Sequence, residues 1–316
     1  MTIDAFDLEK AYYFVRTIRR TEEKIAEIYY TDKVKSPVHL SIGQEAIAVG
    51  ACMALRANDT VFSNYRGHAH YLARGGNLNA MWAELYGKEN GLAGGKAGSM
   101  HLADLSVNFM PASAIVTSAV SNAVGFALAE KMRNTKNIVM CFHGEGAVDE
   151  GVFWESLNFA ALKQAPILFV CENNDYAIYS TQAQRMAGSS IAARAHTFGI
   201  TTSNANGYSS EDVYAATAAA VTSVREGKGP ALLEVDTYRW RDHVGPDDDH
   251  EFGYRETQHL KDAVAKDDMA MLASKLGTAK AAEVNALVEV ELDQALAFAE
   301  SGDFPDADAL MRHAHA

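Results

Sequence analysis

Residues 138–178 read IVMCFHGEGAVDEGVFWESLNFAALKQAPILFVCENNDYAI, and this stretch decides the fold. It contains two short, continuous apolar runs, 138–142 and 167–171, of the kind that is typical of strands buried on both faces. Between them a helical pattern extends to about Gln164, and Pro166 ends it. Strand, helix and strand within about 35 residues form a βαβ unit, so the two strands are predicted to be parallel.

The rest of the chain extends this pattern into an α/β fold. A third strand is predicted at 231–235, after an Ala-rich helix at 211–225. Helical spacing of apolar side chains occurs at 4–31 and 44–56, and the part from 256 to 300 indicates two amphipathic helices. We therefore expect a doubly wound, mainly parallel sheet, which binds its ligand beyond the carboxyl ends of the strands.

Residues 87–113 differ from these segments, because they contain many glycines and show no clear hydrophobic period. A long Gly-rich stretch in a compact domain is usually a functional loop or a backbone that must approach a ligand. We expect such a loop here.

The composition narrows the possible partners. The 316-residue chain has 28 Lys+Arg and 41 Asp+Glu, which gives a formal net charge of −13. This acidic charge disfavours binding to nucleic acid or to anionic membranes. No apolar run approaches the ~18 residues of a membrane span, and the acidic N-terminus lacks a signal-peptide core, so we expect a cytoplasmic protein. The three cysteines lie far apart in apolar stretches and are expected to be buried thiols.

Polar, turn-forming segments follow the two central strands: HGEGA at 143–147 and ENNDY at 172–176. Since parallel strands end at the same edge of a sheet, these turns should meet there. The two glycines of the first turn would let the backbone approach a phosphate, and the following helix would offer its N-terminal N–H groups. Glu145 and Asn174 supply hard oxygen ligands suited to Mg²⁺ or Ca²⁺.

Each turn alone has a simpler interpretation. Gly-x-Gly can be a plain turn, and Asn-Asn can cap a helix. A dinucleotide site is a further alternative, but Asp149 stands where the third glycine of G-x-G-x-x-G belongs. The combination of both turns is more specific than either part.

At this point the sequence resembles the alpha subunits of 2-oxo acid dehydrogenases, the thiamine-diphosphate-dependent, decarboxylating component of pyruvate, branched-chain 2-oxo acid and acetoin dehydrogenases. The stretch 144–178 is similar to the GDG…NN motif of that family. Further segments match in the same order: HLSIGQEAIAVG (39–50), YRGHAHYLARGG (65–76), GLAGGKAGSMHLAD (91–104), GPALLEVDTYRWRDH (229–243) and FAESGDFPDADAL (298–310). The resemblance covers nearly the whole chain, and it implies a thiamine-diphosphate-binding fold in a single domain, 1–316, with an N-terminal helical segment and C-terminal helices.

The resemblance also implies a metal site and a cofactor site. The metal, Mg²⁺, would be held by Glu145, by Asn174 and by the backbone carbonyl of Tyr176. Thiamine diphosphate would lie against these three residues. The other positions that match cofactor contacts are Tyr65, Arg66, Ile115, Val116, Gly144, Gly146 and Ala147.

His243 matches the histidine that faces the reactive thiazolium carbon in the family, so we predict that it is catalytic. It could hydrogen-bond the substrate or move a proton. Taken alone, His243, Arg66 and Tyr65 could each be structural residues. We assign no chemistry to His68, His70 and His101 beyond a possible proton relay.

In this family the glutamate that activates the aminopyrimidine comes from a separate beta subunit. The resemblance therefore implies an α₂β₂ assembly that acts on a small-molecule carbonyl substrate, with a lipoyl acyltransferase as a possible further partner. The alternative is a carboligase or ketol transferase that works with a beta subunit but without a lipoyl complex. A decayed, structural subunit is a third alternative.

The sequence departs from the family pattern at three places. Glu145 replaces the usual aspartate, and its extra methylene moves the carboxylate outward. The segment Ala114–Ser121 has bulkier residues where the family has the glycines of GIVG-x-Q-x-P. Finally, the acidic run 247–249 follows His243. Three carboxylates near a reaction centre would repel an anionic 2-oxo acid, so we expect an acyloin or a sugar-like ketol as substrate.

Overall fold

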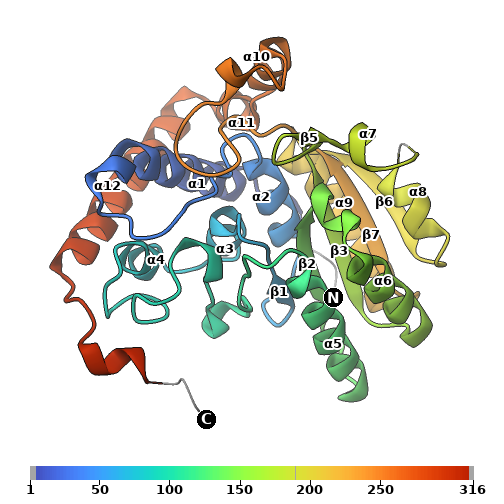
Figure 1. Cartoon of the computed structure of the whole chain (residues 1–316). Helices are drawn as coiled ribbons and strands as arrows, with labels where there is room; N and C mark the ends of the chain where they lie inside the picture. The colour runs from blue at the N-terminus through green and yellow to red at the C-terminus, as the bar shows by residue number, and fades with distance from the viewer. Residues whose placement is uncertain (1–4, 189, 313–316) are drawn as a thin grey trace.

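The centre of the fold is a five-stranded sheet in which all neighbouring strands run parallel, in the order β1-β2-β3-β7-β6 (Figure 1). The computed structural model describes residues 5–188 and 190–312. The strands of this sheet are Thr60–Phe62 (β1), Val139–Gly144 (β2), Ile167–Asn173 (β3), Thr201–Asn206 (β6) and Ala231–Asp236 (β7). The predicted strands at 138–142, 167–171 and 231–235 are thus confirmed, as is their parallel arrangement.

The side chains of the central strands alternate between two hydrophobic cores, one on each face of the sheet. In β3, Leu168 and Val170 belong to one core, whereas Ile167, Phe169 and Cys171 belong to the other. Because both faces are buried, the strands need apolar residues at every position, which explains their continuous apolar runs. The predicted doubly wound α/β fold is confirmed.

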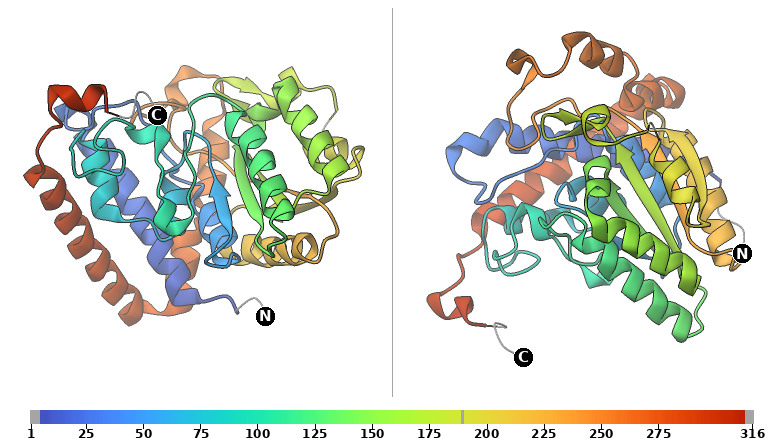
Figure 2. Two further views of the ribbon diagram at one scale, coloured as in Figure 1. Left: turned by 90° about the horizontal axis from the view of Figure 1, so that it is seen from below. Right: turned by 45° about the vertical axis from the view of Figure 1, so that its right-hand side comes forward.

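Helices cover both faces of the sheet (Figures 1 and 2). One core packs against α1 (Leu8–Ile28), α2 (Glu45–Met53), α3 (His68–Ala73), α4 (Leu78–Leu85) and α9 (Ser210–Arg225). The other core packs against α5 (Ser118–Met132), α6 (Gly151–Lys163) and α8 (Ile191–His196). Between β3 and α8 the chain forms a small antiparallel hairpin, β4 (Tyr176–Ala177) and β5 (Ser180–Thr181), followed by the short helix α7 (Gln182–Arg185).

The sequence patterns missed or misplaced some elements. Strand β1 is too short to show a pattern, and β6, TTSNAN, lies at the sheet edge, where a polar sequence is tolerated. The C-terminal part contains three helices rather than two: α10 (Thr257–Val264), α11 (Asp268–Leu276) and α12 (Thr278–Ser301). Gly277, with φ of 90°, separates the last two.

The turn after β2 also differs from expectation. It is a 3₁₀ turn over Glu145–Asp149, and α6 begins only at Gly151. The N–H groups next to Gly144 therefore belong to this tight turn and not to the first turn of an α-helix.

The Gly-rich segment 87–113 contains no α-helix and no strand of the sheet, as predicted. The buried carboxylate of Glu84 organises it by accepting hydrogen bonds from the backbone N–H groups of Ala93, Gly95, Ala97 and Gly98, at 2.7–3.0 Å. One acidic side chain thereby satisfies several backbone donors of an irregular loop.

All three cysteines are free and buried, as predicted. Within the described residues, no helix combines the length and the apolar character that crossing a bilayer requires.

Candidate active site

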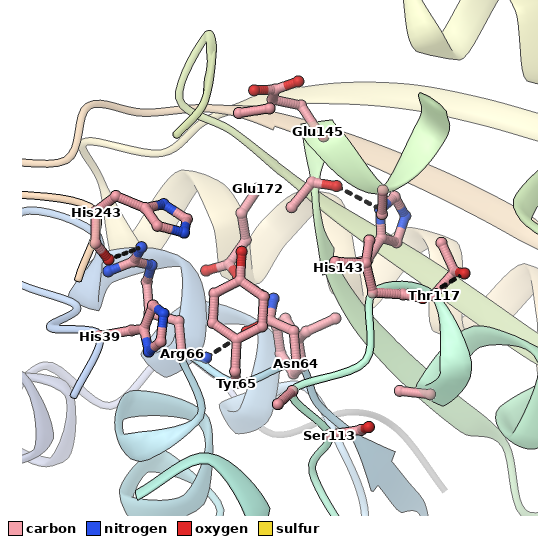
Figure 3. Close-up of a pocket in the computed structure, with 18 of the residues that line it drawn as sticks. His39, Asn64, Tyr65, Arg66, Ser113, Thr117, His143, Glu145, Glu172 and His243 are labelled. Atoms are coloured by element: carbon pink, nitrogen blue, oxygen red, sulfur yellow. Dashed lines mark hydrogen bonds between the residues drawn. The ribbon is translucent and has the colours of Figure 1, made fainter. Parts of the chain in front are cut away.

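A cavity of about 360 Å³ lies beyond the carboxyl ends of β2 and β3 (Figure 3). The register of these strands pairs Gly144 with Glu172, so the two polar turns start side by side, as predicted. Every site residue predicted from the sequence lines this cavity: Tyr65, Arg66, Ile115, Val116, Gly144, Glu145, Gly146, Ala147, Asn174, Tyr176 and His243. The structure thus brings together residues that are up to about 180 positions apart in the chain.

Three rings form one wall of the cavity. The ring centroid of His39 lies 4.4 Å from that of Tyr65 and 5.3 Å from that of His243, and Tyr65 and His243 are 5.8 Å apart (Figure 3). The sequence gives no local signal for His39 beyond its place at the start of the segment HLSIGQEAIAVG. Its position became evident only when the fold brought residue 39 next to residue 243.

Both histidines are neutral near pH 7. Burial lowers the pKa of His243 to about 3 and that of His39 to about 3, and the positive charge of Arg66 acts in the same direction. A neutral imidazole has one free acceptor nitrogen. The Nδ1 atom of His39 is buried and has no hydrogen-bond partner. Both imidazoles line the cavity.

Arg66 is buried beneath this wall and joins two segments. Its Nη1 donates to the backbone carbonyl of Leu40 at 2.5 Å, and its Nη2 donates to the backbone carbonyl of His243 at 3.1 Å. Burial lowers the pKa of Arg66 to about 10, so it remains a cation at neutral pH. These two bonds use two of its five N–H donors. Arg66 therefore fixes the His243 loop and also places a positive charge at the cavity.

A buried carboxylate, Glu172, lines the cavity as well, and sequence analysis did not assign it a role. Its Oε1 contacts Nε2 of His70 at 3.2 Å, and Nδ1 of His70 contacts Oγ of Ser63 at 2.8 Å. The His70 ring stacks on Phe142, with centroids 3.9 Å apart. His70 thus contacts Glu172 from behind and does not itself line the cavity. His68, which contacts Glu22 and Ser99, does not line the cavity either.

The predicted metal ligands lie at the other end of the cavity. One carboxylate oxygen of Glu145, Oε2, accepts a hydrogen bond from Arg185, while Oε1 is buried without a hydrogen-bond partner. Asn174 donates from Nδ2 to Gln44 at 2.9 Å, and its Oδ1 accepts from the backbone N–H of Tyr176 at 3.2 Å. Burial raises the pKa of Glu145, an effect that Arg185 opposes.

This donor set fits a hard divalent cation, because it combines an unpartnered carboxylate oxygen with amide and carbonyl oxygens. No cluster of three or more His, Cys, Asp or Glu side chains suited to a metal occurs among the residues that the structure describes. A single carboxylate leaves room for oxygens from a phosphate ligand.

The two glycines of the first turn have different reasons to be glycine. A Cβ on Gly144 would meet no protein atom within 4 Å, whereas a Cβ on Gly146 would lie 2.8 Å from Cβ of Ala177. Gly146 is therefore required by packing against the β4–β5 hairpin. Gly144 leaves open space that a ligand can fill.

Two β-branched residues that line the cavity have left-handed backbone conformations. Thr117 has φ of 65° and Ile178 has φ of 57°. Such conformations are strained for β-branched residues and concentrate at functional sites. Thr117 stands where the resemblance places a glycine, which would adopt this φ without strain.

The carboxylates of the acidic run 247–249 do not line the cavity, contrary to the premise of the substrate expectation. Asp249 is fully buried and contacts Arg255, Tyr254 and Arg239, while Asp248 pairs with Arg241 at 3.2 Å. Asp247 accepts a hydrogen bond from Tyr30, and none of the three aspartates lines the cavity. Arginines pair with Asp248 and Asp249, so two of the three charges are compensated, and the argument from repulsion loses its premise. The preference for an acyloin or a ketol over a 2-oxo acid stays a prediction.

Comparison with known proteins agrees with this geometry. The family model described as "Dehydrogenase E1 component" matches residues 13–305. The chain belongs to the dehydrogenase E1 component family. The resemblance seen in the sequence is thereby confirmed, as is an enzyme of the thiamine-diphosphate-dependent class.

Individual relatives narrow the family membership to alpha subunits. This E1 chain is 36% identical over 297 residues to subunit alpha of acetoin:2,6-dichlorophenolindophenol oxidoreductase from Bacillus subtilis, covering 93% of this chain and 89% of that protein. It is 34% identical over 310 residues to the pyruvate dehydrogenase E1 component subunit alpha of Rhizobium meliloti, covering 97% and 88%. A second acetoin oxidoreductase alpha subunit, from Cupriavidus necator, is 35% identical over 313 residues.

Proposed function

We propose that this E1 chain binds thiamine diphosphate and a divalent cation in the 360 Å³ cavity and cleaves the bond next to the carbonyl of a 2-oxo acid or an acyloin. The observation that carries the proposal is that all positions assigned to the cofactor line this one cavity at the sheet edge. The names of the relatives, acetoin oxidoreductase and pyruvate dehydrogenase, support both substrate classes.

The diphosphate would lie at the turn after β2. Gly144, Gly146 and Ala147 offer backbone there, and Glu145, Asn174 and the carbonyl of Tyr176 would hold Mg²⁺. The positive charge of Arg66 would attract the anionic cofactor from the opposite wall. Ile115 and Val116 would contact the aminopyrimidine.

When bound, thiamine diphosphate supplies a nucleophilic carbon and a cationic ring that accepts the electrons released by the cleavage. His243 is neutral, so it can donate a hydrogen bond to the substrate oxygen from one ring nitrogen, or receive a proton at the other. His39 stands next to it and has a free Nδ1, so the two imidazoles can share this task. Arg66 positions the loop that carries His243.

The proposal includes a beta subunit. Ile115 and Val116 line the mouth of the cavity and are 71% and 43% exposed in this chain, so a partner must cover them if water is to be excluded. The relatives are alpha subunits by name. We propose an α₂β₂ assembly in which the beta subunit supplies the activating glutamate, with a lipoyl acyltransferase as acceptor of the acyl group. The free cysteines fit a cytoplasmic location.

The test is to co-express the chain with its beta subunit and to measure reduction of an artificial electron acceptor with pyruvate, branched-chain 2-oxo acids or acetoin. We expect turnover that depends on thiamine diphosphate and Mg²⁺, that the isolated chain lacks, and that H243A abolishes. Transfer of the fragment to an aldehyde, without any electron acceptor, would instead indicate a carboligase. Failure to bind the cofactor in the presence of the beta subunit would indicate a structural subunit.

A further inference from the structure

Arg185 lies directly behind the proposed metal ligand Glu145 and contacts three groups. Its Nη2 donates to Oε2 of Glu145, its Nη1 donates to Asp149, and its Nε donates to the backbone carbonyl of Ser180 at 3.2 Å. The guanidinium therefore bridges the turn after β2 and the β4–β5 hairpin. Such a fork of parallel bonds holds two carboxylates in fixed directions.

The contact is built into the fold and is not a chance surface pair. The side chain of Glu145 is 1% exposed and that of Arg185 is 15% exposed. Helix α7, which ends at Arg185, is held by a capping box in which Thr181 and Gln184 bond each other's backbone. The hairpin just before this helix also contains Tyr176, whose carbonyl is a proposed ligand.

Arg185 does not line the cavity, whereas Glu145 does. The guanidinium contacts Oε2 of the carboxylate, whereas Oε1 is buried and has no hydrogen-bond partner. A divalent cation at Oε1 would stand on the opposite side of the same carboxylate from a fixed positive charge. The two cations would repel each other, because the carboxylate is shared and largely shielded from water.

We propose that the positive charge of Arg185 competes with the divalent metal ion for the carboxylate of Glu145. The metal ion then binds tightly only together with the diphosphate. This inference rests on the proposed function, because it takes Glu145 as the metal ligand. The negative charge of the diphosphate offsets the repulsion. By thermodynamic reciprocity, the cation must then raise the affinity for the diphosphate by the same factor.

The length of the glutamate side chain fits this arrangement. Compared with aspartate, the extra methylene of Glu145 extends its carboxylate, which contacts Arg185 through Oε2 and leaves Oε1 without a hydrogen-bond partner. The pair Glu145–Arg185 is therefore expected to act as a unit.

The test uses Mn²⁺ as the probe and the full chain assembled with its beta subunit, freed of cofactor. Binding of Mn²⁺ is followed by the electron paramagnetic resonance signal of the free ion, with and without thiamine diphosphate. The variants are R185Q and R185M, which remove the charge, R185K, which keeps it, and E145Q. The control is R133Q, which removes an exposed arginine at the end of α5 that pairs with Glu130.

We expect the wild type, R185K and R133Q to bind Mn²⁺ weakly alone and at least tenfold more tightly with thiamine diphosphate. R185Q and R185M should bind Mn²⁺ alone at least tenfold more tightly than the wild type, with a smaller effect of thiamine diphosphate. E145Q should lose Mn²⁺ binding in both conditions.

The outcomes distinguish a failure of the inference about Arg185 from a failure of the proposed metal site. If E145Q loses Mn²⁺ but neither neutral variant at position 185 tightens it, the inference about Arg185 is overturned while the metal site of the proposed function stands. If E145Q binds Mn²⁺ like the wild type, Glu145 is not a ligand, and both fail. Two neutral variants are used so that a folding defect in one does not prevent the measurement.

Discussion

Nη2 of Arg66 donates a hydrogen bond of 3.1 Å to the backbone carbonyl of His243, 177 residues away in the chain. The second bond of the same guanidinium, to the carbonyl of Leu40, ties the segment that carries His39 to the same point. One buried arginine thus sets the relative positions of the two neutral histidines of the cavity.

Replacing Arg66 with lysine should affect both stability and activity. R66K keeps the charge but cannot bond both carbonyls in the planar geometry of a guanidinium, and an unsatisfied buried acceptor costs roughly 1–3 kcal/mol. We expect a lower free energy of unfolding and a kcat reduced at least tenfold. R225K is the control, because Arg225 bonds Asp59 at the other end of the sheet. R225K should lower the free energy of unfolding without changing the KM for substrate. Equal reductions of kcat in R66K and R225K would contradict the positioning role of Arg66.

The buried histidines predict a specific dependence of stability on pH. Their pKa is lowered from 6.5 to about 3 in the folded chain, so below about pH 6.5 the unfolded state binds more protons than the folded state. Stability is therefore lost as the pH falls from 6.5 toward 3, with a slope of up to about 1.4 kcal/mol per pH unit for each histidine. Urea unfolding between pH 5 and 6.5 should show a reduced slope in H39Q and H243Q. An unchanged slope in both would show that these rings titrate normally.

Thr117 offers a test of backbone strain. Because its φ is 65°, T117G should increase the free energy of unfolding by about 1 kcal/mol, whereas T117A should give no such gain. The comparison of the two variants by urea denaturation separates the backbone effect from loss of the hydroxyl, which donates to the carbonyl of Val116. Destabilisation by T117G would mean that the hydroxyl outweighs the strain.

Gly144 and Gly146 should respond differently to the same substitution. A Cβ at position 146 collides with Ala177, so G146A should displace the β4–β5 hairpin and lower the melting temperature. A Cβ at position 144 meets no protein atom within 4 Å, so the free energy of unfolding of G144A should stay within about 0.5 kcal/mol of that of the wild type, with little change in melting temperature. Thermal melting of the cofactor-free chain checks this contrast. Equal melting temperatures for the two variants would contradict it.

The corrected interpretation of the acidic run can be tested directly. D249N removes a buried partner of Arg255 and should destabilise the chain by about 3–5 kcal/mol, because buried charges are left unpaired. D247N and D248N should stay within about 0.5 kcal/mol of the wild type. Neither of these exposed variants should change the ratio of kcat/KM for pyruvate and acetoin. A shift of that ratio toward pyruvate would restore the idea of repulsion.

The sequence predicted those parts of the fold that depend on local patterns. The apolar runs of β2, β3 and β7 were recognisable because burial on both faces requires apolar residues throughout. Strand β6 was missed because it is a polar edge strand, whose pairing with β7 depends on tertiary position alone. The predicted single domain stays a prediction.

The site residues likewise divide into those that a sequence motif indicates and those that depend on tertiary position. Motif positions such as Gly144, Asn174 and His243 were named from the sequence and lie together in the structure. Arg185 could not be predicted, because its partner Glu145 is 40 positions away and nothing in the sequence around helix α7 points to it. The acidic run was misjudged because charge alone does not show which arginines a loop will meet.

The most direct test of the proposed cofactor site is calorimetric titration of thiamine diphosphate, in the presence of Mg²⁺, into the chain assembled with its beta subunit. We predict saturable binding of one cofactor per alpha chain, weakened at least tenfold by G144A and unchanged in R133Q. An absence of binding, or equal affinities for the wild type and G144A, would contradict the assignment of this cavity to the cofactor.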